Sequence, residues 1–285
     1  MRLFQRLHLI PATLLCFFCA CNGSAATQRE SPSVPPAKEE NFSSDLFFEE
    51  EQQPEESTEN VYWNVDAIDI SDVDPSRKLI AFTFDDAPAR TMENILAVFA
   101  SFNEKNEDCR ASATVFFNGA LFNAETPHLL YTACALGFEL GNHTYSHLDL
   151  TSLSKETLTE EIDKTDALLE KIDGQKRHLL RAPFGKTNEL VKECAKTPLI
   201  DWTIDTLDWT KISEEEIYNT VFNHRFSGAI VLMHDGYEHT VSALKRLLPD
   251  LKKDGYQVVS VSKMIKAHGC KFRRGGVYIR ARKQN

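Results

Sequence analysis

From about residue 61 onward, apolar residues occur in two patterns, one of regular spacing and one of short continuous runs. Two stretches, 154–172 and 239–253, have apolar residues at three- and four-residue steps, which predicts helices with one buried face. Ser154 begins the first stretch and is expected to cap that helix. Short apolar runs predict strands at 79–84, 113–117, 137–140, 179–180, 199–204, 229–233 and 258–261. Strands that alternate with helices favour parallel βα units, and about seven strands favour an α/β fold closed like a barrel.

The first 21 residues have the pattern of an export signal. Arg2 and Arg6 precede an apolar run at 9–20 that is too short to span a bilayer stably. Two cleavage sites compete. Cleavage before Cys21 would leave a lipoprotein with an acylated terminal cysteine, which we favour, and the small residues at 24–26 suit ordinary signal peptidase. Both alternatives export the protein, either as a membrane-anchored lipoprotein of the periplasm or cell envelope or as a secreted protein.

Charge is distributed unevenly along the chain. The sequence has 42 acidic and 32 basic side chains, a formal net charge of −10, and 42% hydrophobic residues, which is typical of a globular protein. Residues 22–60 are rich in Pro, Ser, Gln and Glu and predict an acidic, disordered tether. The domain that follows, 61–270, is near neutral. Nucleic-acid binding is therefore not expected, because phosphate contacts need a basic face.

The chain end is basic. No acid occurs from Met264 onward, and we expect 271–285 to form a basic C-terminal tail. One interpretation is an electrostatic hook for an anionic envelope surface; the other, which we favour, is a solvated end.

Four cysteines lie in the predicted domain: Cys109, Cys134, Cys194 and Cys270. They lack the short paired spacing of a zinc site. Outside the cytoplasm they could form up to two disulfides, in any of three pairings. Four partly buried free thiols are the alternative. The sequence leaves both alternatives open.

Five of the predicted strands lead into an acid, a histidine or an arginine. These residues are Asp85, Asp86, His143, Arg181, Asp205, Asp208 and His234. In a βα barrel the C-terminal ends of the strands share one rim, where active sites of such folds lie. Side chains alternate along a strand, so Asp85 is expected inside the barrel and Phe82 and Phe84 under the helices. His143 and His147 would share one face if a helical turn begins there, and with the Asp pair they predict a metal site.

These segments resemble, in order, the five motifs of the polysaccharide deacetylase family, the NodB-homology domain of carbohydrate esterase family 4. The matching segments are Thr83–Pro88 (TFDDAP), His143–His147 (HTYSH), Arg181–Phe184 (RAPF), Asp205–Trp209 (DTLDW) and Leu232–His234 (LMH). The resemblance covers about residues 76–265. Ala87 stands where the family has Gly, and Phe184 where Tyr is commoner. The resemblance implies a distorted, NodB-like (β/α) barrel.

The resemblance also implies a metal centre and a substrate pocket. Asp86, His143 and His147 would bind one divalent metal ion, with Zn expected first and Co as the alternative. The backbone N–H of Phe184 would contribute to an oxyanion hole. Trp209 and Leu232 would line a pocket for the acetyl methyl group.

Four further residues receive catalytic roles from the resemblance. Asp85 would be the general base, and Arg181 would hold it ionised and oriented. Asp208 would brace Arg181 and the region of His234. His234 would be the general acid that protonates the leaving amine, which leaves poorly without a proton.

We therefore expect a metal-dependent hydrolase that removes N-acetyl groups from an amino-sugar polymer. Export makes peptidoglycan N-acetylglucosamine the first substrate expected and chitin-type oligosaccharides the second. An O-acetyl esterase of the same fold and a non-catalytic module that binds envelope glycans are the alternatives. Such a module would have lost a base, an acid or a ligand, and the sequence has all of them.

Overall fold

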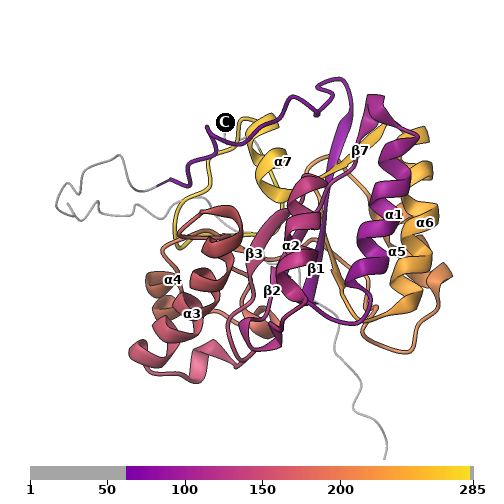
Figure 1. Ribbon diagram of the computed structural model, residues 1–285. Helices are drawn as coiled ribbons and strands as arrows, with labels where there is room; N and C mark the ends of the chain where they lie inside the picture. The colour runs from indigo at the N-terminus through magenta and orange to yellow at the C-terminus, as the bar shows by residue number, and fades with distance from the viewer. Residues whose placement is uncertain (1–61, 283–285) are drawn as a thin grey trace, which may run out of the picture. The chain divides into compact units, whose positions relative to one another are not determined.

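A computed structural model describes residues 62–282 (Figure 1). The expected signal peptide at 1–21, with Cys21, and the expected tether at 22–60 lie outside the described residues. No helix in the described part is long and apolar enough to cross a membrane. Strands and helices alternate along the chain, as the apolar pattern predicted.

Every pairing between the named strands of the described chain is parallel. The strands are β1 (Lys78–Ala87), β2 (Thr114–Phe117), β3 (Glu139–Asn142), β4 (Leu199–Ile200), β5 (Ile204–Asp205), β6 (Ile230–His234), β7 (Tyr256–Val259) and β8 (Val277–Tyr278). The apolar run predicted as one strand at 199–204 is split into β4 and β5. The run at 179–180 forms only isolated bridges.

The strands form a six-stranded and a two-stranded sheet, which the bridges of Leu180 and the chain between β4 and β5 link into a ring. β1 pairs with β2, and β2 pairs with β3. Leu180 then bridges Asn142 at the end of β3 and Leu199 at the start of β4. The chain continues through 201–203 into β5, which pairs with β6, and β6 pairs with β1 again. This path agrees with the distorted (β/α) barrel that the resemblance implies.

β1 is the central strand, and its side chains alternate between two environments. Its first half pairs with β7 and its second half with β2, while β6 also pairs with it. Phe82 and Phe84 are fully buried in the larger core cluster, beneath the helices. Ala81 packs in a separate inner cluster with Phe116. The expected alternation of side chains along β1, which places Asp85 on the inner side, is confirmed.

The helices contact one another in the order α5, α6, α1, α2, α3, α4. Figure 1 shows α1, α5 and α6 grouped on one side and α3 and α4 on another. The helices are α1 (Met92–Glu104), α2 (Thr126–Ala135), α3 (Lys155–Asp173), α4 (Glu189–Ala195), α5 (Glu214–His224), α6 (Glu238–Lys253) and α7 (Val261–Ala267). The stretches predicted at 154–172 and 239–253 are α3 and α6. The Ser154 side chain caps α3 by accepting a hydrogen bond from the Thr157 backbone.

Residues 271–282 pack on the domain and do not form the expected tail. β8 pairs with β4, and the rings of Phe272 and Tyr278 stack with centroids 3.8 Å apart. Ala281 is buried, and Arg280 forms an antiparallel bridge with Ala229. This packing corrects the boundary expected at residue 270. Apolar residues placed between the arginines give the segment a side that can be buried.

Within residues 62–282 the cysteines favour the alternative of free thiols over two disulfides. Cys109, Cys134 and Cys194 are free thiols. Burial raises the pKa of the Cys134 thiol to about 11, so this group is protonated near neutral pH.

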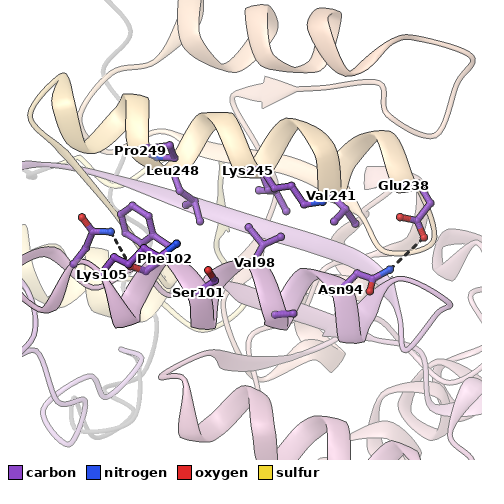
Figure 2. Close-up of a pocket in the computed structure, with 13 residues that line it drawn as sticks. Asn94, Val98, Ser101, Phe102, Lys105, Glu238, Val241, Lys245, Leu248 and Pro249 are labelled. Carbon is purple, nitrogen blue, oxygen red and sulfur yellow. Dashed lines mark hydrogen bonds between the residues drawn. The ribbon is translucent and has the colours of Figure 1, made fainter.

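A groove of about 600 Å³ lies between α1 and α6 (Figure 2). Apolar side chains that include Val98, Val241 and Leu248 line it, and Asn94 donates a hydrogen bond of 3.3 Å to Glu238 between the two helices. None of the polar strand-end residues lines this groove. The candidate site therefore lies elsewhere.

His178 is a buried histidine beside α3. Its Nδ1 atom lies 2.9 Å from a carboxylate oxygen of Asp166, and its Nε2 atom lies 3.2 Å from Asp173. Burial alone would lower the pKa of His178, but the hydrogen bonds to Asp166 and Asp173 raise it to about 9. His178 is therefore positively charged at neutral pH.

We expect the free energy of unfolding to depend on pH through His178. Its pKa is about 9 in the folded chain against an ordinary value of 6.5, so its stabilisation is complete below pH 6.5 and is lost as the pH rises through 9. Relative to a His178→Gln variant, the unmodified chain should lose on the order of 3 kcal/mol across this range. Urea denaturation at a series of pH values measures this difference. A difference that stays constant with pH would contradict a charged His178.

Candidate active site

One cavity of about 500 Å³ lies where several parallel strands end. Asp85 and Asp86 lie near the C-terminal end of β1, His143 follows β3, and His234 ends β6. The lining residues are Asp85, Asp86, His143, His147, Ala182, Phe184, Gly185, Trp202, Asp205, Trp209, Leu232, His234 and Tyr237. The structure thus brings together the site residues expected from the sequence. Arg181 and Asp208 do not line the cavity and are fully buried.

Three ligand atoms converge in this cavity. Asp86, His143 and His147 each offer one ligand atom, and these atoms lie within 4.8 Å of one another. The Nε2 atoms of His143 and His147 lie 3.7 and 3.5 Å from Oδ1 of Asp86. Two imidazoles and one carboxylate form a ligand set typical of catalytic zinc sites, which keep one position open. These residues therefore fit one divalent metal ion.

Left-handed backbone positions bring the ligands together, and a helix does not. His143 and His147 were expected to share a helical face, but residues 143–147 form a loop in which Thr144 and His147 have φ of 67° and 55°. Asp86 has φ of 61°. On a regular strand Asp86 would point away from Asp85. The left-handed turn instead brings its carboxylate toward the histidines.

The backbone carbonyl of Arg181 orients the ring of His143. The carbonyl oxygen lies 2.7 Å from Nδ1 of His143. Because a carbonyl only accepts, Nδ1 carries the proton and Nε2 keeps its lone pair toward Asp86. Burial lowers the pKa of His143 despite the nearby charges of Asp85 and Asp86, which favours the neutral ring. A neutral ring is the form that binds a metal ion.

Asp85 is buried and paired with a buried arginine. Its side chain accepts a hydrogen bond of 2.8 Å from Nη1 of Arg181. Burial alone would raise the pKa of Asp85, but the positive charge of Arg181 lowers it overall. The carboxylate is therefore ionised near neutral pH and able to accept a proton.

Each nitrogen of the Arg181 guanidinium group donates a hydrogen bond. Besides Asp85, Nη1 donates to Oγ1 of Thr83 at 2.7 Å, and Nε donates to the carbonyl of Ile200 at 2.8 Å. Nη2 donates to the carbonyl of Asp201 at 3.3 Å, and the Phe116 ring centre lies 4.3 Å from the guanidinium carbon. A planar group with this many partners has little freedom to rotate. It therefore fixes the orientation of Asp85 as well as its charge.

Asp208 braces His234 and makes no hydrogen bond with Arg181 within the described residues, which corrects the expectation that it would brace both. One of its oxygens lies 2.7 Å from Nδ1 of His234. The other accepts from the His234 backbone N–H at 2.8 Å and from Thr240 at 2.7 Å. The reason is topological. Asp208 follows β5, which pairs with β6, and β6 ends at His234.

The pair of Asp208 and His234 favours a protonated imidazole. Burial alone would lower the pKa of His234, but the hydrogen bond to Asp208 and the charge of Asp85 raise it overall. Nδ1 is occupied by Asp208, so Nε2 is the ring nitrogen left for the cavity. His234 can therefore donate a proton near neutral pH.

Large side chains stand at the mouth of the cavity. Phe184 and Trp209 are 62% and 54% exposed, whereas Leu232 is buried. The ring of Phe184 packs edge-on against His147, with centroids 4.8 Å apart. Exposed aromatic faces beside a polar cavity suit contact with a sugar ring.

Sequence reasoning missed two aromatic residues of this cavity. Tyr237 lies beside the candidate acid, with its ring centroid 6.4 Å from that of His234. The sequence signal for Tyr237 as a cavity residue was its position three residues after His234. Trp202 lies over Arg181, with the guanidinium carbon 5.7 Å from its ring centre. It stands inside the apolar run at 199–204, where a tryptophan resembles ordinary core.

Asp235 was also missed, and it holds the short loop that follows Asp86. Its carboxylate accepts from the backbone N–H groups of Ala89 and Thr91 at 2.6 and 3.1 Å, and from the Thr91 hydroxyl at 2.6 Å. Asp235 is buried, so these bonds are shielded from water. The loop after β1 is thereby tied to the end of β6.

Comparison with known proteins identifies relatives of this chain. Residues 72–198 match the sequence profile described as polysaccharide deacetylase. A peptidoglycan-N-acetylglucosamine deacetylase of Bacillus cereus is 36% identical over 205 residues, which are 68% of this chain and 92% of the relative. The peptidoglycan-N-acetylmuramic acid deacetylase PdaC of Bacillus subtilis is 33% identical over 193 residues, which are 67% of this chain and 40% of PdaC.

A solved structure supports the same relationship. The peptidoglycan deacetylase PdaC from Bacillus subtilis superposes with a TM-score of 0.62 at 32% sequence identity, covering 68% of this chain and 93% of the solved chain. The matched region of this chain spans less than half of full-length PdaC but nearly all of the relative from Bacillus cereus.

We expect metal binding to depend on His143. A His143→Ala variant removes one of the three ligand atoms, so it should contain less zinc than the unmodified chain after loading with one equivalent and desalting. Elemental analysis measures the bound metal. His128→Ala, an exposed histidine of α2, is the matched control and should retain the metal. Equal metal content in both variants would contradict this site.

Proposed function

The chain belongs to the polysaccharide deacetylase family, and we propose that it hydrolyses N-acetyl groups of an amino-sugar polymer of the cell envelope. Peptidoglycan N-acetylglucosamine is the proposed substrate. One observation carries the proposal: an ionised Asp85 and a readily protonated His234 line the same cavity as the three-ligand cluster. The relatives from Bacillus cereus and Bacillus subtilis are named for peptidoglycan, which supports this class of substrate.

Asp86, His143 and His147 would hold the divalent ion, for which we propose zinc, with cobalt as the alternative. A divalent ion at such a site polarises an acyl oxygen and makes water more acidic. The two neutral rings and one carboxylate leave part of the ionic charge uncompensated. The backbone N–H of Phe184, at the cavity wall, would add a hydrogen bond to the developing oxyanion.

Asp85 would act as the general base. Its second oxygen, Oδ2, lies 3.6 Å from Nε2 of His143 and so faces the ligand cluster, while Oδ1 is occupied by Arg181. The lowered pKa keeps Oδ2 unprotonated and able to take a proton from the attacking water. Arg181 would prevent the carboxylate from turning away.

His234 would act as the general acid. An amine expelled from a tetrahedral intermediate needs a proton, and Nε2 of His234 can deliver one into the cavity. Asp208 keeps Nδ1 occupied and favours the charged ring. Trp209 and Leu232 would line the pocket for the acetyl methyl group.

We also propose that the protein is exported and acts at the cell envelope. Arg2, Arg6 and the apolar run at 9–20 support an export signal, and Cys21 would be the site of lipid attachment. An envelope location would place the cavity near the proposed glycan. The lipid anchor and ordinary secretion remain the two forms of this proposal.

Two variants separate the base from the acid and an amidase from an esterase. Asp85→Asn keeps the shape of the side chain but removes the base, so hydrolysis of amide and ester should both fall by roughly 10²–10⁴. His234→Asn should slow N-deacetylation much more than hydrolysis of an activated acetyl ester, whose leaving group needs no proton. Mass spectrometry of peptidoglycan fragments and chitooligosaccharides follows the first reaction, and release of an activated phenol follows the second.

Both variants should retain bound metal, because the three ligands are unchanged. If His234→Asn slows both substrates equally with metal content and folding intact, His234 is not a selective leaving-group acid. It would then orient the substrate or stabilise the oxyanion, and the amidase assignment would lose its main chemical support. If the unmodified, metal-loaded chain deacetylates neither glycan, the hydrolase proposal fails and a glycan-binding role takes its place.

A further inference from the structure

The loop that carries both histidine ligands has a backbone that needs external support. Thr144 and His147 both adopt left-handed φ values, which residues other than glycine rarely do. Each such residue is strained and persists only when its surroundings hold it. The contacts of this loop therefore decide whether His143 and His147 stay in position.

Helix α3 supplies two of these contacts. Oε2 of Glu161 accepts from the backbone N–H of Ser146 at 2.7 Å. The buried side chain of Asn142 donates from Nδ2 to the carbonyl of Ile162 and to Oδ1 of Asp166, each at 2.9 Å. Its own Oδ1 accepts from the backbone N–H of Thr144 at 2.8 Å. Asn142 thus joins α3 to the left-handed residue between the ligands.

Asp166 and the carbonyl of Ile162 together determine which way the Asn142 amide points. Carboxylate and carbonyl oxygens both accept hydrogen bonds, so the Nδ2 end of Asn142 faces these two groups. The Oδ1 end is then left for the Thr144 N–H. Without a carboxylate at 166 this preference weakens, and the opposite orientation would place an amide N–H against the N–H of Thr144.

Asp166 is itself held by two cations. Nδ1 of His178 lies 2.9 Å from Oδ1 of Asp166, and Nη1 of Arg177 lies 3.1 Å from Oδ2. Asp166 is 3% exposed, and a buried carboxylate without such partners would be destabilising. The other charged groups around this cluster are Asp173 beside His178, Asp163 beside Arg177, and Glu139.

We propose that Asp166 is a positioning residue for the metal centre, acting through Asn142 on the backbone of the loop that carries His143 and His147. Within residues 62–282 it makes hydrogen bonds with Asn142, Arg177 and His178 and with neither histidine ligand. This inference rests on the metal centre of the proposed function. It adds a requirement in α3, outside the cavity, that the motifs of the loop do not contain.

The test is metal affinity, measured without catalysis. Zinc is titrated into the metal-free full-length chain against a chromogenic chelator, and the visible absorption of the cobalt form reports ligand geometry. Asp166→Leu should lower zinc affinity by about 10- to 100-fold, the usual effect of removing support behind a metal ligand. Asp166→Asn retains an oxygen that can accept from Asn142 and should recover most of the affinity.

Asp163→Leu is the matched control. Asp163 lies one turn earlier on α3 and pairs with the same Arg177, but it is exposed and has no hydrogen bond with Asn142. Its zinc affinity and cobalt spectrum should match those of the unmodified chain. A loss equal to that of Asp166→Leu would overturn the proposal, because loss of charge on α3 would then explain both.

A second variant decides the question if Asp166→Leu does not fold. Asn142→Ala removes the link and leaves the contacts of Asp166 with Arg177 and His178 in place, so it should lose zinc affinity to the same extent. In the double variant the two losses should not add, because both act through one path. Zinc affinity unchanged in folded Asn142→Ala would overturn the proposal. Failure of the unmodified chain to bind zinc would instead contradict the proposed metal centre itself.

Discussion

Arg181 carries a positive charge into the interior of the ring of strands, where an unpaired charge would cost several kcal/mol. Asp85 balances this charge at 2.8 Å, and Thr83 and the carbonyl of Ile200 satisfy further donors. The backbone of the same arginine orients His143. Its position is set by Leu180, which bridges β3 and β4 immediately before it. The ionisation of Asp85 and the orientation of one ligand therefore depend on a single buried residue, whose own position depends on the pairing of the strands.

Separate partners shift the pKa values of the proposed base, Asp85, and the proposed acid, His234, in opposite directions. Arg181 lowers the pKa of Asp85 against the effect of burial, and Asp208 raises the pKa of His234 against the same effect. Environments that separate an acid from a base in this way are typical of hydrolytic sites that work near neutral pH. Because Arg181 and Asp208 share no hydrogen bond in the described chain, each pair can be altered without directly removing the support of the other.

The cavity also collects backbone conformations that are rare for residues with a side chain. Non-glycine residues with left-handed φ include Asp86, Thr144, His147 and Phe184, all at or beside the rim. Such positions need surroundings that hold them. Asp235 holds the loop after Asp86, and α3 holds the loop of the histidines. The outer elements thus contribute to the geometry of the site as well as to the core.

The periodicity of apolar residues was enough to predict α3, α6 and most strands, because burial of one face imposes a local pattern. It also predicted that residues at strand ends would meet, because parallel strands in a barrel place their C-terminal ends on one rim. The periodicity did not determine the contacts between segments that are distant in the sequence. Asp208 braces His234 because β5 lies beside β6, and residues 271–282 pack because β8 pairs with β4. The loop at 143–147 likewise contacts α3, where Glu161 accepts from the backbone N–H of Ser146. Such contacts depend on which segments become neighbours on folding, and local sequence spacing does not encode that choice, so only the tertiary structure decided them.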